Sequence, residues 1–149
     1  MKLVIQRVDE AKVTVDEAII GRISKGLLIL VGISDTDTTD IADKLLDKAL
    51  KMRIFDDENG VMNKSILEDG GEILVISQFT LHASTKKGNR PSYIKAAKPE
   101  ISVPLYERFC KDLSRALGKE IGTGTFGADM KVELLNDGPF TVLLDSDEL

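Results

Sequence analysis

Apolar and polar residues alternate over residues 2–8 and 12–15, and Val and Ile are frequent among the apolar ones. This alternation predicts an N-terminal strand that bends between the two segments. Residues 18–23 have a similar composition and should return as the second strand of a hairpin. Residues 27–33 are apolar almost without interruption and are bounded by glycine, which predicts a strand buried on both faces.

Two longer segments repeat their apolar residues at helical spacing. Residues 38–52 predict a first helix, and residues 34–37 supply capping side chains and early acidic charge for it. A second helix is expected from Pro99 to the stop signal at Gly118. The apolar stripe of this second helix consists of Val103, Tyr106, Cys110, Leu113 and Leu117, with Phe109 beside it.

The remaining apolar runs are short and predict strands at residues 53–55, 72–78, 130–135 and 140–144. The acidic tail that follows the last strand is expected to be frayed. Many strands and two main helices, without a regular strand–helix alternation, predict an α+β fold with a mostly antiparallel sheet or a small β-barrel. The length fits a single domain over residues 1–149.

Composition narrows the possible locations and partners. The chain is 42% hydrophobic and 30% charged, which is ordinary for a soluble globular protein. Its longest apolar run, residues 27–31, is far too short to span a bilayer, and the N-terminal residues do not resemble a signal peptide. The single cysteine excludes an internal disulfide framework and fits a reducing compartment. We therefore expect a cytoplasmic protein that does not contact a membrane.

Metal-binding residue types are scarce. With one histidine and one cysteine, the chain lacks the ligands of a typical zinc site. The acidic turn at residues 56–60 lacks the alternation and the closing glutamate of a calcium loop. We therefore expect neither a metal nor a cofactor.

Basic residues are concentrated in one segment of an otherwise acidic chain. The net charge of −5 argues against indiscriminate binding of nucleic acid. Residues 82–98 nevertheless contain no acidic residue, and an aromatic residue, Tyr93, lies among their charges. This segment is either a solvated surface loop or a surface for an anionic partner, and the pattern leaves both open. Its five basic residues are Lys86, Lys87, Arg90, Lys95 and Lys98.

The strand at residues 72–78 ends in the motif Ser77-Gln78-Phe79-Thr80-Leu81. Hydroxyl and amide groups at a strand end are usually caps, but Ser77 and Thr80 are also candidate nucleophiles. A conventional catalytic triad needs a histidine, and the only one is His82, which we expect to be a half-exposed residue rather than a general base. Backbone donors and a positioned water are therefore the more plausible chemistry.

Two other candidate sites are better explained by structure. Cys110 lies on the apolar stripe of the second helix, with nothing nearby to lower its pKa, so we expect a core residue. The glycine-rich segment 122–127 matches neither the dinucleotide fingerprint nor the P-loop pattern. It is predicted to be a structural loop, although it could line a pocket.

A second motif, Asn136-Asp137-Gly138-Pro139-Phe140-Thr141, separates the last two predicted strands. The commonest meaning of such a sequence is a hairpin turn. The alternative is a peptide plane presented to a ligand, because glycine allows close approach and proline leaves its carbonyl as a bare acceptor. The sequence leaves both readings open.

Together the two motifs closely resemble the signature motifs of the D-aminoacyl-tRNA deacylases. The first of them extends from Ser77 to Ala83. The resemblance spans essentially the whole chain in order, since it also covers residues 4–8, 53–55, 88–92 and 126–130.

This resemblance implies a homodimeric hydrolase that cleaves the ester between a D-amino acid and the terminal ribose of tRNA. It implies that the enzyme also removes glycine from mischarged tRNA, and thus proofreads translation. Gly138-Pro139 would be a cis peptide inserted into the active site of the opposite subunit, with Arg7 helping to fix that loop. The reaction centre would be lined by Ser77, Gln78, Phe79 and Thr80.

The expected partner is the 3′ end of an aminoacyl-tRNA. Lys86, Lys87 and Arg90 would bind phosphates near the acceptor end, where they position the RNA without reading its sequence. Met130 and Phe79 would pack against the terminal adenine.

Three alternatives follow from the same residues. In one mechanism the substrate's 2′-hydroxyl accepts the proton, whereas in the rival mechanism Thr80 is a covalent nucleophile. A rival class is a non-catalytic module that binds tRNA ends or small amino-acid conjugates. A third reading is a relative with a trans Gly138-Pro139 bond that accepts L-substrates.

Overall fold

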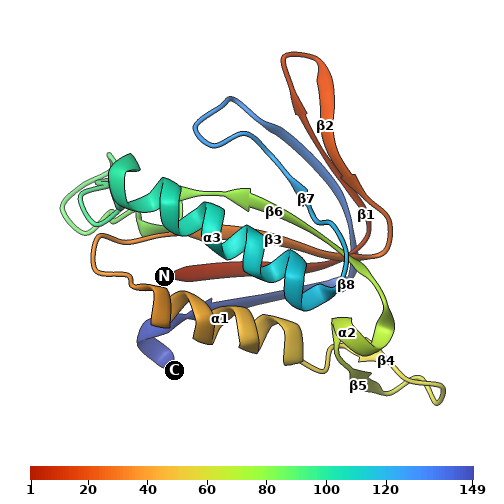
Figure 1. Ribbon diagram of the computed structural model, residues 1–149. Helices are drawn as coiled ribbons and strands as arrows, with labels where there is room; N and C mark the ends of the chain where they lie inside the picture. Colours follow the sequence, from red (N-terminus) through yellow and green to blue (C-terminus); the bar gives the residue numbers. More distant parts are fainter.

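A curved six-stranded sheet forms the body of the molecule, and two long helices cover one of its faces (Figure 1). The computed structural model describes residues 1–149. The sheet strands are β1 (Lys2–Val15), β2 (Ala18–Ile23), β3 (Gly26–Gly32), β6 (Glu72–Ser77), β7 (Gly122–Thr123) and β8 (Lys131–Asp145). The helices are α1 (Thr39–Lys51), α2 (Ile66–Asp69) and α3 (Pro99–Leu117). A separate small sheet contains β4 (Phe55–Asp56) and β5 (Met62–Lys64), and the 3₁₀ turns are η1 (Phe79–His82) and η2 (Ser146–Glu148).

The long strand β1 organises the sheet, because it pairs with β2, β3 and β8, in each case antiparallel. The pairs β3–β6 and β6–β7 are parallel, so the sheet is mixed rather than mostly antiparallel. Parallel neighbours need a long crossover, and the chain from α1 to α2 supplies it. The strand–helix–strand unit from β3 to β6 was not recognised in the sequence, because the short elements β4, β5 and α2 lie between α1 and β6. β2 also lies near β6 and β7, which curls the sheet towards the predicted small barrel.

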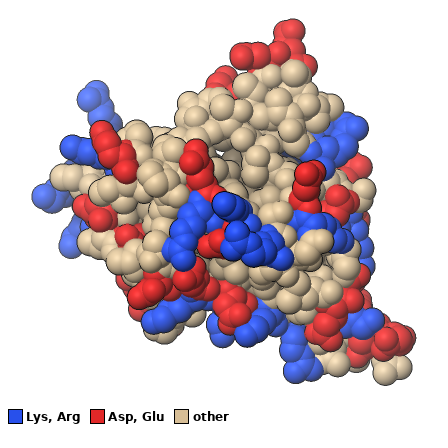
Figure 2. Space-filling view, viewed as in Figure 1, with Lys and Arg blue, Asp and Glu red and all other residues tan.

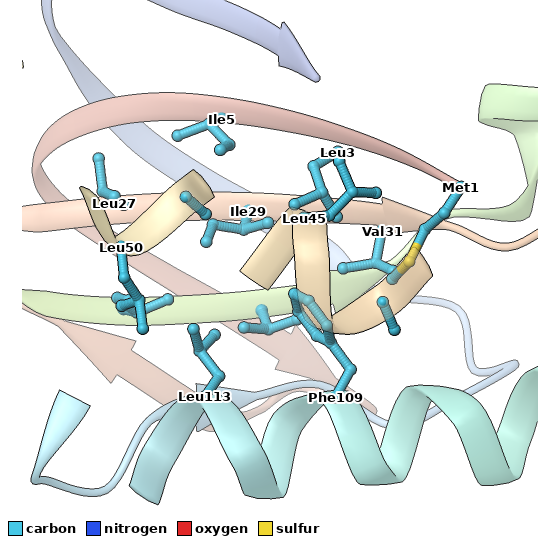
Figure 3. Packing of buried hydrophobic residues seen from close by; sticks show 14 of the residues in the cluster. Met1, Leu3, Ile5, Leu27, Ile29, Val31, Leu45, Leu50, Phe109 and Leu113 are labelled. Carbon is cyan, nitrogen blue, oxygen red and sulfur yellow. The ribbon is translucent and has the colours of Figure 1, made fainter. Parts of the chain in front are cut away.

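Apolar clusters cover both faces of the sheet, and β3 contributes to both. Leu27 and Ile29 belong to the cluster under the helices, whereas Leu28 belongs to the cluster on the opposite face. The prediction of a strand buried on both faces is therefore confirmed. Under the helices, the sheet side chains meet residues of α1 and α3, including Leu45 and Phe109 (Figure 3). Burial of one such side chain stabilises a fold by about 1.5–3 kcal/mol.

Both predicted helices are present, close to their expected bounds. The helix α1 begins after Thr38, whose side chain accepts a hydrogen bond from the backbone N–H of Ile41. The helix α3 begins at Pro99 and ends at Leu117, and the Gly118 that follows it has φ +80°. None of the helices is both long enough and apolar enough to cross a membrane.

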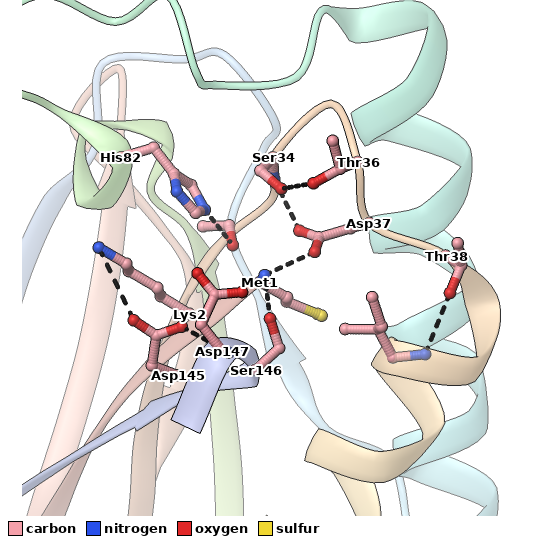
Figure 4. Close-up of polar contacts among 12 residues, drawn as sticks. Met1, Lys2, Ser34, Thr36, Asp37, Thr38, His82, Asp145, Ser146 and Asp147 are labelled. Atoms are coloured by element: carbon pink, nitrogen blue, oxygen red, sulfur yellow. Dashed lines mark hydrogen bonds and ion pairs between the residues drawn. The ribbon is translucent and has the colours of Figure 1, made fainter. Parts of the chain in front are cut away.

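The C-terminal tail is docked, which corrects the expectation that it is frayed. The backbone N–H of Ser146 donates to the carbonyl of Met1, and the Ser146 hydroxyl accepts from the Met1 ammonium at 2.8 Å. The same ammonium forms a 2.6 Å ion pair with Asp37 (Figure 4). These contacts connect η2 to β1 and to the loop before α1. One predicted boundary also needs correction, since β4 begins at Phe55 rather than Arg53. The short elements β5, α2 and β7 were not predicted.

The two predicted C-terminal strands are parts of one strand, β8, and do not form a hairpin. Both halves pair antiparallel with β1, with Asn136 opposite Val8 and Thr141 opposite Gln6. Between these pairs β1 advances by two residues and β8 by five, so β8 contains three extra residues. The chain therefore bulges out of the sheet around Gly138-Pro139 and then resumes its course.

Candidate active site

The chain leaves the sheet at Ser77 and turns at once into η1. Ser77 lies opposite Val31, and the backbone N–H of the next residue, Gln78, donates to the Val31 carbonyl at 2.7 Å. The following residues, Phe79–His82, form a 3₁₀ turn. The first N–H groups of such a turn have no partner within it. Accordingly, the backbone N–H groups of Phe79 and Thr80 donate to no other group of the chain.

The side chains around Thr80 do not form a catalytic triad. The Gln78 amide donates to the Thr80 hydroxyl, and no histidine or carboxylate is hydrogen-bonded to that hydroxyl. His82 is only 8% exposed, so the expectation of a half-exposed residue is wrong. Its ring Nε2 lies 3.0 Å from the carbonyl oxygen of Gly32, which holds the ring against β3. The site therefore offers backbone donors but no general base next to a nucleophile.

Two cavities flank this strand end. One has a volume of about 290 Å³ and is bounded by α3 and the end of β3, including Tyr106 and Val31. The other, of about 260 Å³, lies towards β8, and its lining includes Met130 and Phe79, the two residues expected at the terminal adenine. Both cavities are lined by Ser77, Gln78, Phe79, Phe126 and Gly127.

The glycine-rich loop lines both cavities through Phe126 and Gly127, a role that its sequence left open. A larger cavity of about 580 Å³ lies elsewhere, between the β1–β2 hairpin and β8. It contains none of the predicted site residues and mixes acidic and basic side chains, so we do not assign the reaction to it. No three His, Cys, Asp or Glu side chains lie together as possible metal ligands.

An exposed aromatic pair stands beside the basic segment. The Phe79 and Tyr93 side chains are 54% and 42% exposed, and their rings meet edge to face with centroids 5.1 Å apart. Lys86, Lys87 and Arg90 are exposed and make no ion pair within the chain. Lys and Arg side chains project from this end of the molecule, at the left of the view (Figure 2). Their charge is therefore available to an anionic partner.

The bulge of β8 contains the second motif, and its Gly138-Pro139 bond is cis. Arg7 lies beside this bulge. Its Nε donates to the Asp137 carbonyl at 3.1 Å, its Nη1 donates to the Ile54 carbonyl at 2.6 Å, and its guanidinium lies over the Phe140 ring. Arg7 thus ties the bulge to the body of its own chain.

One chain does not bring the two motifs together. Ser77 pairs with Val31, which pairs with Leu3, whereas the bulge lies beside Arg7, four residues further along β1. Strands rise about 3.3 Å per residue and lie about 4.8 Å apart, so four residues and three strand spacings place the motifs on the order of 20 Å apart. The Gly138-Pro139 peptide cannot reach the strand-end site of its own chain.

Cys110 is half-buried on α3, next to the buried Tyr106. Burial raises the pKa of the Cys110 thiol to about 11, and it also raises the pKa of Tyr106. These shifts support a core residue rather than a nucleophile.

Cys110 should therefore react slowly with iodoacetamide. At pH 8 a thiol with a pKa of about 11 is almost entirely protonated, and only the thiolate is reactive. We expect alkylation at least about tenfold slower than that of free cysteine, measured by mass spectrometry. Protein unfolded in urea is the control and should react at the free rate. Fast alkylation of the folded protein would mean that the thiol is activated.

Comparisons with known proteins agree with one another over most of the chain. The family model described as D-Tyr-tRNA(Tyr) deacylase matches residues 4–145. Proteins named D-aminoacyl-tRNA deacylase from Bacteroides thetaiotaomicron and Parabacteroides distasonis are 75% and 61% identical over 146 residues, which is 98% of this chain and 97% of each relative.

Solved structures also match. A structure titled "c-Myc DNA Unwinding Element Binding Protein" has a TM-score of 0.91 and 38% identity, and the match covers 97% of this chain and 98% of that one. A probable eukaryotic D-amino acid tRNA deacylase has a TM-score of 0.83 over 96% of this chain and 97% of its own. At 20% identity, this second likeness concerns the fold alone.

Proposed function

Since the chain belongs to the D-Tyr-tRNA(Tyr) deacylase family, we propose that it hydrolyses the ester between a D-amino acid and the terminal ribose of tRNA. Family membership confirms the resemblance of the whole sequence to the deacylases. The observation that carries the proposal is the pair of free backbone N–H groups at Phe79 and Thr80, at the strand end whose residues line both cavities. The same reaction would remove glycine from mischarged tRNA and so proofread translation.

An aminoacyl ester is already activated, so the reaction needs mainly an aligned water and donors for the oxyanion. Water attacks the ester carbonyl, and the N–H groups of Phe79 and Thr80 stabilise the negative oxygen. Loss of one such donor costs about 10²–10³ in rate in other enzymes. The intermediate collapses when the C–O bond to the ribose 3′-oxygen breaks. The adjacent 2′-hydroxyl relays the proton of the water to that oxygen, which yields the free D-amino acid and the tRNA 3′-hydroxyl.

Chiral selection in this proposal comes from the Gly138-Pro139 loop of a second subunit. Within one chain this loop is too far from Ser77 to act on the same substrate, and Arg7 holds it from its own side. If its carbonyls hold the substrate ammonium, an L side chain collides with backbone, whereas a D side chain points to solvent. Glycine, which has no side chain, is accepted.

A free strand edge supports the homodimer. β8 pairs only with β1, so its other edge has no partner in the chain. Leu135 and Leu143 of this strand are exposed. A long edge strand with exposed apolar side chains is a surface on which another chain can pair. We propose that a second copy covers it.

The basic segment would hold the acceptor end of the tRNA. Exposed lysine and arginine side chains bind phosphates without reading sequence. Phe79, which stands against Tyr93, and Met130, which shares its cavity, offer apolar contact for the terminal adenine. Stacking of a base on an aromatic side chain contributes about 1–3 kcal/mol.

Replacement of Lys86 and Lys87 together by alanine should weaken binding of D-Tyr-tRNA by about tenfold at low salt. Each lost phosphate contact also lowers the slope of log K against log salt concentration by about 0.7–0.9. Fluorescence titration at several salt concentrations measures both. The control changes Lys44 and Lys48, which are exposed on α1, and should bind as the wild type does. An unchanged slope in the first variant would remove the basic segment from the RNA surface.

One experiment tests the function against its rivals. The protein is incubated with D-Tyr-, L-Tyr- and Gly-charged tRNA, and ester loss is followed. We expect loss of D-Tyr and glycine, but not of L-Tyr. Binding without ester loss from any of the three would favour the non-catalytic module. Loss of L-Tyr at a rate comparable with D-Tyr would mean that the protein does not select D substrates, although its Gly138-Pro139 bond is cis and not trans as in the third alternative.

A further inference from the structure

The side chain of Asn136 spans the base of the β8 bulge. Its Oδ1 accepts a hydrogen bond from the backbone N–H of Phe140 at 2.8 Å, and its Nδ2 donates to the carbonyl of the same residue at 2.9 Å. Two residues that exchange both N–H and C=O bonds form the hydrogen-bonded pair of an antiparallel ladder. The Asn136 side-chain amide forms the same two bonds with the Phe140 backbone that the backbone of a neighbouring strand would form.

The residues of the bulge are not paired with the main chain of β1, so the Asn136 side chain takes the place of that pairing. Pairing of β8 with β1 stops at Asn136 and resumes at Thr141. The β1 residue between the two pairs is Arg7, which is paired with Leu27 on its other side and has no partner in β8. The side chains of Arg7 and Asn136 therefore supply hydrogen bonds to the backbone carbonyls of the bulge.

These two side chains perform different tasks. Arg7 bonds the Asp137 carbonyl and the Ile54 carbonyl, so it fixes where the bulge sits on the body of the protein. Asn136 bonds only Phe140, so it fixes how far apart the two ends of the bulge lie. Gly138 and Pro139 lie between those ends. Their carbonyl directions consequently depend on the Asn136 contact.

We propose that Asn136 is a positioning residue that shapes the Gly138-Pro139 loop within one chain, before any second subunit docks. This inference rests on the proposed function, in which that loop selects D over L substrates. The loop has its final conformation before it enters the partner's site. Selectivity therefore does not require the partner to change the conformation of the loop. A rigid loop rejects an L side chain, whereas a loose loop can move away from it.

The test compares Asn136→Ala, which removes both bonds, with Asn136→Asp, which keeps the acceptor for the Phe140 N–H but cannot donate to its carbonyl at neutral pH. Two readouts are measured: hydrogen exchange of the Phe140 amide, and the D-Tyr to L-Tyr ratio of kcat/KM. We expect Asn136→Ala to speed the exchange and to lower the ratio, each by at least about tenfold, with Asn136→Asp between it and the wild type. Asn59→Ala is the control, because that side chain lies in the remote β4–β5 turn and makes no hydrogen bond.

The outcomes are distinct. Unchanged Phe140 exchange in both variants would overturn the structural role of Asn136. Faster Phe140 exchange with an unchanged D to L ratio would overturn the positioning role, because the contact would then stabilise the loop without affecting selectivity. If the wild type hydrolyses none of the substrates, the proposed function fails, and the exchange of Phe140 still decides whether Asn136 shapes the loop. Should Asn136→Ala fail to fold, Asn136→Asp gives both readouts.

Discussion

D-Tyr-tRNA that ends in 2′-deoxyadenosine should be hydrolysed about 10²–10⁴-fold more slowly than D-Tyr-tRNA with a normal terminal ribose. This range is the usual contribution of a positioned acid–base group, and the protein supplies no such group at the strand end. His82 is buried and bonded to the Gly32 carbonyl, and the Thr80 hydroxyl accepts only from the Gln78 amide. In the proposed mechanism the 2′-hydroxyl of the substrate therefore relays the proton.

Single-turnover ester loss measures this effect. The uncatalysed hydrolysis of both esters must be measured in parallel, because removal of the 2′-hydroxyl also changes the intrinsic reactivity. The ratio of catalysed to uncatalysed rates is then compared between the two substrates. A matched protein variant, Thr80→Ala, should keep activity within about tenfold of the wild type, because the proposed oxyanion donors are backbone groups.

The covalent mechanism predicts the reverse on both counts. A Thr80 nucleophile would leave Thr80→Ala inactive and would give an acyl-enzyme adduct that mass spectrometry detects after rapid quenching. The deoxy substrate would then react at close to the normal relative rate. That pair of results would replace the substrate-assisted mechanism by the Thr80 mechanism.

Local periodicity predicted most of the elements. The alternation in β1, the continuous apolar run of β3 and the helical stripes of α1 and α3 each reflect burial against the same core. Such patterns are visible in sequence because each element must bury one or both of its faces. The strand-end motif was also accessible, because Ser77, Gln78, Phe79 and Thr80 are consecutive and follow a buried strand directly.

The features that sequence could not reveal depend on contacts between distant segments. The parallel pairing of β3 with β6 and the burial of His82 against Gly32 follow from how the sheet is assembled. The second motif was ambiguous because a hairpin and a bulge have the same turn residues. Only the pairing of both halves of β8 with one strand distinguishes them. The free N–H groups at Phe79 arise in the same way, since the chain turns there instead of extending.

Replacement of Gly138 by alanine is expected to lower kcat/KM for D-Tyr-tRNA by about 10²-fold, the usual cost of a shift of about 1 Å in a positioned group. Gly138 has φ +155°, and a β-carbon built there would lie 2.5 Å from the backbone nitrogen of Phe140 and 2.9 Å from its β-carbon. The Phe140 nitrogen is a backbone atom, and its N–H is bonded to the Asn136 side chain, so it cannot move aside as a flexible side chain would. The whole bulge must move instead.

Gly60→Ala is the matched control for backbone strain. Gly60 also has a positive φ, +73°, but a β-carbon there would meet no atom within 4 Å, and the residue lies in the turn between β4 and β5. Both variants should lose some stability, whereas only Gly138→Ala should lose activity per folded molecule, as measured by circular dichroism and ester loss. Full activity in folded Gly138→Ala would mean that the bulge does not touch the substrate. Chiral selection would then have to come from the strand end of one chain, where Ser102 and Tyr106 also line the cavity beside Ser77.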